Sequence, residues 1–125
     1  MILVDTSVWI DFFRQSDTKI DELLTSYLEM GEIIAISAVF GELLQGAGGE
    51  MEEKMILEFW ENLPKVEEEL FIEAGKLSNQ LKLTTRGVGL IDSYILAAVK
   101  LNKLTLWTLD KKLVQIYNTI QNSKK

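Results

Sequence analysis

The chain has 125 residues with no cysteine and no histidine, and 47% of it is hydrophobic and 26% charged. This composition is typical of one folded domain with a single core and unlike that of a disordered chain. The missing cysteines exclude disulfides and thiolate chemistry. The missing histidines exclude histidine bases, Ser-His-Asp triads and nearly all zinc enzymes. Any catalysis therefore depends on carboxylates, hydroxyls, lysines or a bound metal ion.

The net charge of −6 is unevenly distributed along the sequence. Residues 1–75 carry 17 acids and 4 bases, whereas residues 76–125 carry 9 bases and 2 acids. Those two acids are Asp92 and Asp110. A segment that offers cations to a polyanion normally excludes acids from its contact surface. The two carboxylates therefore either have a specific role or simply begin helices, and the charge pattern leaves both interpretations open.

The sequence gives no sign of a membrane or secretion segment. No apolar run approaches the roughly 18 residues that a membrane-spanning helix needs. The opening stretch MILVDTSVW lacks the basic start of a secretion signal. We therefore expect a cytoplasmic protein without a membrane partner.

Short apolar runs alternate with segments of helical periodicity along the chain. In chain order we predict a strand at 2–4, helices at 7–14 and 19–29, a strand at 33–36, a helix that ends in the glycine cluster at 46–49, a helix at 50–63, a short edge strand within 65–69, a helix at 70–83, a basic loop at 84–89, a helix at 90–102, a strand at 104–108, a helix at 111–118 and a frayed tail at 122–125. Asp5, Thr6 and Ser37 are suited to cap the helices after them, and Gly31 and Pro64 are suited to end helices.

This alternation, without β-hairpin signals, predicts an α/β fold with a mainly parallel sheet. Right-handed crossovers then place helices on both faces of the sheet. Repeats, linkers and a second domain are not recognisable, so residues 1–125 are expected to form one domain.

Four acids are predicted to reach one edge of the sheet. In open α/β sheets, sites form beyond the carboxyl ends of the strands, where the strand order reverses. Asp5 and Asp110 follow strands, Glu42 lies in the second turn of the helix after the second strand, and Asp92 lies in the first turn of the helix before the third. Each also has a purely structural interpretation: a cap for Asp5, a dipole partner for Asp92, a turn for Asp110 and a solvated helix face for Glu42.

Carboxylates crowded at one site persist only if some are protonated or a cation neutralises them. Oxygen ligands suit Mg²⁺, or Mn²⁺, better than zinc. Such a cation suits phosphodiester hydrolysis, because it polarises the phosphoryl oxygen and activates a water. Thr6, Ser7 and Thr108 lie near the acids and are suited to orient waters at such a site, although capping and strand hydroxyls explain them equally well.

Three stretches carry a family resemblance: ILVDTSVWIDFFR, ISAVFGELLQGA and LIDSYILAAVKLNKLTLWTLDKKL. These stretches occur in the same order and at similar separations as in PIN-domain ribonucleases. The chain therefore resembles that family, specifically VapC-type toxins of toxin–antitoxin pairs. The resemblance covers nearly the whole chain. It implies a Rossmann-like sheet of four to five strands with helices on both faces, and Mg²⁺-dependent endoribonuclease activity. The family's catalytic, metal-binding quartet falls on Asp5, Glu42, Asp92 and Asp110, and its hydroxyl on the last strand falls on Thr108.

The resemblance also implies a homodimer and a cognate VapB-type antitoxin that inserts a segment near the active site. Two features depart from the family pattern. Lys112 stands where many relatives carry a further acid, which puts that extra ligand in doubt. The family's final short strand is hard to find in residues 118–122. Without it, the predicted sheet has four strands and not five.

For the mechanism we expect Asp5, Asp92 and Asp110 to hold one or two Mg²⁺ ions, with Glu42 as a further ligand or as the group that positions the attacking water. Metal-activated water then hydrolyses an RNA phosphodiester in line. The expected phosphate contacts are Arg86, Lys111 and Lys112, which flank the two late acids and are otherwise ordinary surface cations.

Three other functions are compatible with an α/β domain of this length. A signalling receiver domain also combines an α/β unit of this length with an acidic pocket and Mg²⁺, but it needs adjacent acids after the first strand, where Asp5 is followed by Thr6. A phosphatase of the Asp-x-Asp type needs an acid at position 7, which is Ser7. A catalytically silent PIN-like module that binds RNA or protein is the third alternative to a nuclease, and the intact quartet argues against it.

Overall fold

The computed structural model describes residues 1–66 and 69–122. The elements of the chain are β1 (Ile2–Val4), α1 (Thr6–Arg14), α2 (Thr18–Glu29), β2 (Ile33–Ile34), α3 (Ser37–Gln45), α4 (Glu50–Asn62), α5 (Phe71–Leu81), the 3₁₀ helix η1 (Leu83–Arg86), α6 (Leu90–Asn102), β3 (Thr105–Trp107) and α7 (Lys111–Asn122). Within the described ranges, no helix is both long and apolar enough to cross a bilayer.

The strands form a parallel sheet in the order β2-β1-β3. The chain leaves β1 for a neighbour on one side and later returns to the other side, so the strand order reverses at β1. Val4 at the end of β1 pairs with Trp107 at the end of β3. The residues that follow these two strands therefore start from neighbouring points on the carboxyl edge of the sheet.

The predicted edge strand is present in part. Ala35, just after β2, forms a parallel bridge with Lys65, with Ala35 N donating to Pro64 O at 2.8 Å and Val66 N donating to Ala35 O at 3.1 Å. The sheet thus consists of three strands plus this bridge within the described chain. Residues 67–68, which belong to the predicted strand, lie outside the described residues.

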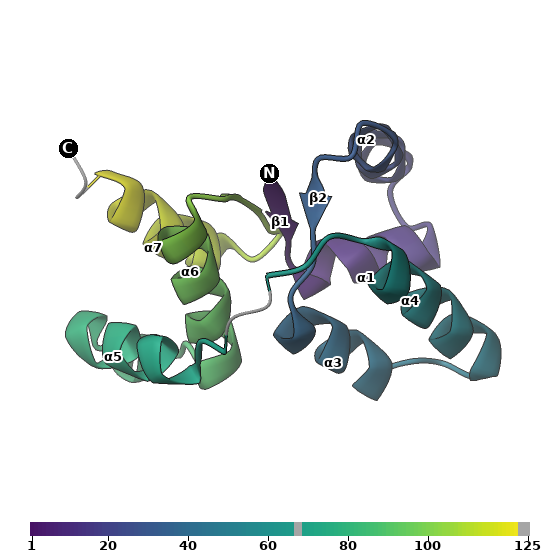
Figure 1. Cartoon of the computed structure of the whole chain (residues 1–125). Coiled ribbons are helices and arrows are strands. Elements are labelled where there is room, and N and C mark those ends of the chain that lie inside the picture. The colour runs from purple at the N-terminus through teal and green to yellow at the C-terminus, as the bar shows by residue number, and fades with distance from the viewer. Residues whose placement is uncertain (67–68, 123–125) are drawn as a thin grey trace.

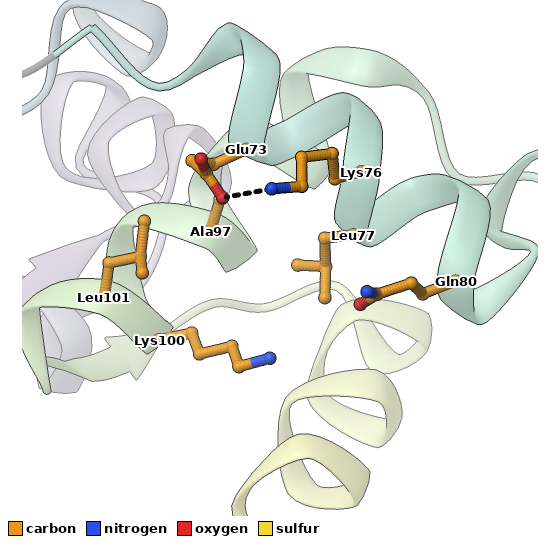
Figure 2. A pocket seen from close by; sticks show the side chains of 7 residues that line it. All are labelled: Glu73, Lys76, Leu77, Gln80, Ala97, Lys100 and Leu101. Atoms are coloured by element: carbon orange, nitrogen blue, oxygen red, sulfur yellow. Dashed lines mark ion pairs between the residues drawn. The ribbon is translucent and has the colours of Figure 1, made fainter.

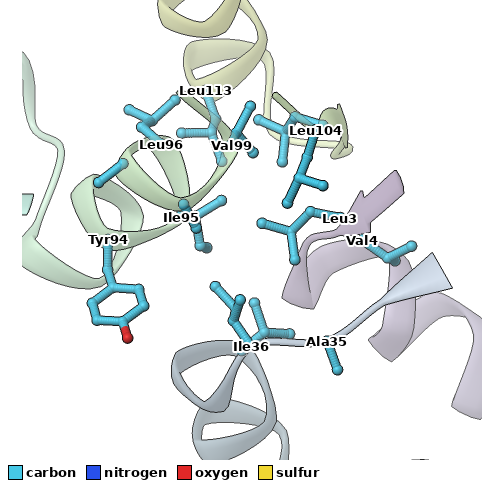
Figure 3. Packing of buried hydrophobic residues seen from close by; sticks show 14 of the residues in the cluster. Leu3, Val4, Ala35, Ile36, Tyr94, Ile95, Leu96, Val99, Leu104 and Leu113 are labelled. Carbon is cyan, nitrogen blue, oxygen red and sulfur yellow. The ribbon is translucent and has the colours of Figure 1, made fainter. Parts of the chain in front are cut away.

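Helices flank the strands in two groups (Figure 1). The helices α1 to α4 lie on one side of the strands and α5, α6 and α7 lie on the other, with contact between α3 and α6 joining the groups. Buried Leu3 of β1, Ile95 of α6 and Leu113 of α7 belong to one continuous apolar core (Figure 3). The α/β prediction with a parallel sheet and helices on both faces is confirmed.

Several predicted boundaries are wrong, for identifiable reasons. The N-cap of α3 is Ile36 and not Ser37, and no side chain caps that helix end. Helix α7 extends to Asn122, because Ile116 and Ile120 continue its buried face at helical spacing, so 118–122 is helical. The basic loop at 84–89 contains most of η1. The part of the predicted frayed tail at 123–125 lies outside the described residues.

Candidate active site

Asp5 is a buried carboxylate whose orientation is set by two hydroxyl groups. Its side chain is only 5% exposed at the junction of β1 and α1. Its Oδ2 accepts hydrogen bonds from Ser7 Oγ at 2.9 Å and from Thr108 Oγ1 at 2.6 Å. Although Asp5 occupies the N-cap position of α1, its side chain makes no capping hydrogen bond. The interpretation of Asp5 as a simple cap is therefore wrong.

The same two hydroxyls bind the backbone between β3 and α7. Ser7 Oγ accepts from Leu109 N at 3.0 Å, and Thr108 Oγ1 accepts from Asp110 N at 3.0 Å. The hydroxyls also lie 3.4 Å from each other. Each hydroxyl thus connects Asp5 to the loop that carries Asp110, which fixes these two acids at adjacent strand ends.

Asp110 also stabilises the start of α7. Its Oδ1 accepts from Lys112 N at 2.9 Å and from Leu113 N at 3.3 Å, which is the bonding of a helix N-cap. The structural interpretation of Asp110 therefore holds for one of its oxygens. Its side chain is exposed at the sheet edge, so this cap does not separate it from the other acids.

Glu42 is not a freely solvated helix residue. It is partly buried on α3, and its Oε1 accepts a hydrogen bond from Thr6 Oγ1 at 2.8 Å. Thr6 is the first residue of α1, directly after Asp5. This bond brings the carboxylate from the third helix to the end of β1.

The negative charges of Asp5, Glu42 and Asp110 all affect the pKa of Asp92. It is partly buried in the first turn of α6. Burial is the largest cause that raises its pKa to about 6, and the charges of Asp5, Glu42 and Asp110 raise it further, in that order. The positive charge of Lys112 lowers it in part. The structure thus brings together four carboxylates from four different parts of the chain at the reversal point of the sheet.

Lys112 has a contact that the sequence did not predict. Its Nζ lies 2.9 Å from the position that a Cβ would occupy at Gly87, the residue after η1. Gly87 also has a φ of +75°, and this left-handed backbone conformation favours glycine there. The Lys112 side chain therefore crosses from α7 to the loop before α6. No sequence signal indicates this contact, because it depends on how α6 and α7 pack.

The two other predicted phosphate contacts, Arg86 and Lys111, lie close in the chain to residues of the site and form no ion pair with an acid within the described ranges. Arg86 ends η1 and Lys111 begins α7, and both side chains are exposed. Across residues 1–66 and 69–122, the ion pair present is Lys76–Glu73 at 3.9 Å. Arg86 and Lys111 are thus cations without an acidic partner in those ranges.

The four acids have the donor atoms that a hard divalent cation prefers, but their side chains are not oriented to bind one. Their donors are all oxygens, which suit Mg²⁺, and their mutual repulsion at Asp92 is what a bound cation would offset. Over the described ranges, however, no group of three acids is arranged to hold a metal ion. Glu42 is bonded to Thr6 and Asp110 to the α7 backbone, so these two carboxylates would have to turn.

A separate small cavity lies between α5 and α6, away from the acids (Figure 2). It has a volume of about 160 Å³ and is lined by Glu73, Lys76, Leu77, Gln80, Ala97, Lys100 and Leu101. Its α6 residues belong to the C-terminal half of that helix, whereas Asp92 lies in the first turn. The cavity is therefore not part of the carboxylate site.

A parallel α/β sheet with acidic side chains at its reversal point places this chain among α/β proteins whose site lies at the carboxyl edge of the sheet. The PIN domain model matches residues 2–118, so the chain belongs to the PIN-domain family. This membership is incompatible with the receiver-like interpretation.

Relatives and a solved structure agree with this assignment. The chain is 34% identical over 114 residues to Ribonuclease VapC32 of Mycobacterium tuberculosis, covering 90% of this chain and 87% of the relative. It is 32% identical over 113 residues to Ribonuclease VapC1 of Methanocaldococcus jannaschii, covering 89% and 76%. The crystal structure of FitAcB from Neisseria gonorrhoeae has the same fold, with a TM-score of 0.67 at 20% identity over 94% of both chains.

Proposed function

We propose that this protein is a Mg²⁺-dependent endoribonuclease, with Mn²⁺ as a possible substitute, that hydrolyses RNA phosphodiesters. The observation that carries this proposal is the gathering of four acids at the strand ends. The hydroxyls of Ser7 and Thr108 link Asp5 to the loop of Asp110, and Thr6 bonds Glu42 beside Asp5. The charges of these three acids also raise the pKa of Asp92, after burial as the largest cause. Four acids gathered in this way suit a divalent cation better than any reaction of the carboxylates alone. The ribonuclease names of two relatives support RNA as the substrate.

The carboxylates of Asp5, Asp92, Asp110 and Glu42 would hold the cation. When bound, Mg²⁺ supplies positive charge that polarises the phosphoryl oxygens and favours ionisation of the attacking water. Ser7 and Thr108 bond the Oδ2 atom of Asp5, so its Oδ1 atom is the one left for a ligand. These fixed hydroxyls orient Asp5 before any ligand arrives, which lowers the cost of assembling the site.

The remaining residues act on the substrate. Glu42 either joins the ligands or positions the attacking water, and Thr6 restrains its carboxylate in both cases. Lys112 brings its ammonium group close enough to Asp92 to lower the pKa of that acid, so it is suited to bind a phosphate oxygen at the same place. Arg86 and Lys111 contact neighbouring phosphates.

As a VapC-type protein, the chain would be the toxin of a toxin–antitoxin pair. Its partner would be a VapB-type antitoxin that inhibits it near the carboxylates, and it would act as a homodimer in the cytoplasm. Co-expression with a candidate VapB-type antitoxin, followed by co-purification and a cleavage assay before and after removal of that partner, tests this part of the proposal.

The deciding experiment compares purified, antitoxin-free wild-type protein with two matched variants on total and structured RNA, with Mg²⁺ and then with EDTA. Asp92→Asn removes a charge from the site. Asp21→Asn makes the same change in α2, where burial and then Asp11 and Asp17 raise the pKa of another aspartate. We expect Mg²⁺-dependent cleavage by the wild type and Asp21→Asn, and a loss of about 100-fold or more in Asp92→Asn.

Each other result has a clear meaning. Cleavage that survives both EDTA and Asp92→Asn would contradict the carboxylate–metal mechanism. RNA binding without cleavage under Mg²⁺ or Mn²⁺ would favour the silent binding module instead.

A further inference from the structure

One surface groove combines a cation, neutral hydrogen-bonding side chains and an exposed apolar side chain. It lies between the C-terminal half of α5, η1 and the start of α6, and has a volume of about 430 Å³. We call it the α5–η1 groove, and its lining includes Ser78, Asn79, Lys82, Thr84, Thr85 and Leu90. The volume falls in the range of about 300–1,000 Å³ for small-ligand sites, which suits one or two unstacked nucleotides and not a duplex.

The α5–η1 groove and the carboxylate site lie on different sides of the start of α6. Leu90 lines the groove and Asp92 belongs to the site, and side chains two residues apart on a helix leave it on opposite sides. On the other side, η1 carries Thr84 and Thr85 and leads directly into Gly87, against which Lys112 lies. The groove is therefore connected to the carboxylate site through η1 and Gly87, which Lys112 approaches from the side of the acids.

The charge of the groove favours a polyanion. Among the described residues that line it there is a lysine and no acid. Lys82 is exposed and forms no ion pair with an acid in the described ranges, where Lys76–Glu73 is the pair present. By contrast, the groove along α4 is lined by Glu50, Glu53, Glu58 and Glu61, together with Lys54 and Leu57, and would repel phosphates.

We propose that the α5–η1 groove binds the single-stranded segment of RNA next to the phosphodiester that is cut. Lys82 contacts a phosphate, Asn79 and the hydroxyls hydrogen-bond base edges or the 2′-hydroxyl, and half-exposed Leu90 packs against a base. This inference rests on the proposed function and adds to it a recognition site distinct from the acids.

A matched pair of lysine variants tests the charge. Lys82 and Lys103 are both C-cap residues in the left-handed region, with φ values of 52° and 53°, so glycine suits both backbones. Lys103 follows the far end of α6, away from the groove. In an Asp92→Asn background that leaves RNA intact, Lys82→Gly is expected to weaken binding of a fluorescent single-stranded RNA about fivefold, and Lys103→Gly to have little effect. The slope of log Kd against log salt should also become shallower by about 0.7 in Lys82→Gly alone.

A second pair of variants, at Gly75, tests whether RNA occupies the space of the α5–η1 groove. Gly75 lines the groove from α5, and a Cβ added there meets no atom within 4 Å. Gly75→Trp therefore places a bulky ring at the groove from a position with room for its Cβ, whereas Gly75→Ala adds only that Cβ. We expect Gly75→Trp to weaken single-stranded RNA binding about tenfold or more, a cost of about 1.4 kcal/mol per tenfold, and Gly75→Ala to bind like its parent. Thermal unfolding of each variant checks the fold, and if Gly75→Trp is unstable the lysine pair decides.

The outcomes separate this inference from the proposed function. Equal effects of Lys82→Gly and Lys103→Gly, or full binding by a folded Gly75→Trp, would overturn the groove assignment while Mg²⁺-dependent cleavage by the wild type leaves the nuclease proposal intact. Loss of binding in Lys82→Gly and Gly75→Trp alone would support the groove even if the wild type cleaves no RNA, in which case the nuclease proposal fails.

Discussion

The charge of Asp92 is unfavourable in the metal-free protein. Burial and then Asp5, Glu42 and Asp110 raise its pKa from 3.8 to about 6. The folded chain therefore binds this proton more tightly than the unfolded chain. The stability that Asp92 contributes is fully present below about pH 4 and is lost as the pH rises through about 6.

Because of this linkage, we expect the inactive variant Asp92→Asn to be more stable than the wild type at neutral pH. At about pH 7.5 in EDTA, Asp92→Asn should increase the free energy of unfolding by on the order of 1 kcal/mol, after allowance for solvent screening, and the gain should shrink towards about pH 5. Added Mg²⁺ should raise the melting temperature of the wild type and not that of the variant. Calorimetry at both pH values measures this, and a variant less stable than the wild type at the higher pH would contradict it.

Ser7 is the residue that joins Asp5 to the β3–α7 loop. Its hydroxyl donates to Asp5 Oδ2 and accepts from Leu109 N. Ser7→Ala leaves both groups without this partner and should cost about 1–2 kcal/mol of unfolding free energy and weaken Mg²⁺ binding. Ser26→Ala on the exposed face of α2 is the control and should be neutral or slightly stabilising. Chemical denaturation and Mg²⁺ titration of both variants measure the difference, and identical behaviour would remove Ser7 from the site.

At the scale of the element, Asp110 has two roles on α7 that substitution can separate. Its Oδ1 caps the helix by accepting from Lys112 N and Leu113 N. Asn can keep the cap without the charge, whereas Ala keeps neither. Both Asp110→Asn and Asp110→Ala should lose cleavage, but only Asp110→Ala should lose about 1 kcal/mol of stability. Equal stability of the two variants would show that the cap contributes little.

The order of elements was predictable because it depends on local patterns. Apolar runs of strand length alternate with helical periodicity, and 90–102 was predicted as a helix with the bounds that α6 has. The predicted helix boundaries were wrong where tertiary packing determines them. Ile36 is the N-cap of α3 although Ser37 is the better capping residue, and buried Ile120 keeps α7 helical. Local preference is weaker than burial in both cases.

The site was predictable to the extent that strand ends define it. Asp5 and Asp110 follow paired strands, so their meeting follows from the sheet order. The Thr6–Glu42 hydrogen bond and the approach of Lys112 to Gly87 depend on how helices pack, and no spacing in the sequence encodes them. Side-chain partners between distant elements therefore needed the structure.

Over the whole molecule, the acidic and basic parts of the chain set how strongly RNA binds. The net charge of −6 opposes general attraction of a polyanion, so the attraction must come from local cations. The exposed cations proposed to contact RNA are Lys82 in the α5–η1 groove and Arg86, Lys111 and Lys112 at the carboxylate site. Each phosphate contact on a single strand contributes a slope of about −0.7 to log affinity against log salt, so four contacts predict about −3 for the wild type.

Fluorescence anisotropy across a range of salt concentrations in the Asp92→Asn background measures this slope. Replacing Lys112 by methionine, which keeps an unbranched side chain but removes the charge, should make the slope shallower by about 0.7. Lys54 on α4 stands among the glutamates of the opposite group of helices, so Lys54→Met is the matched control and should leave the slope unchanged. A slope near zero would mean that RNA is held by shape and hydrogen bonds, whereas one steeper than about −6 would require basic residues beyond this edge of the sheet.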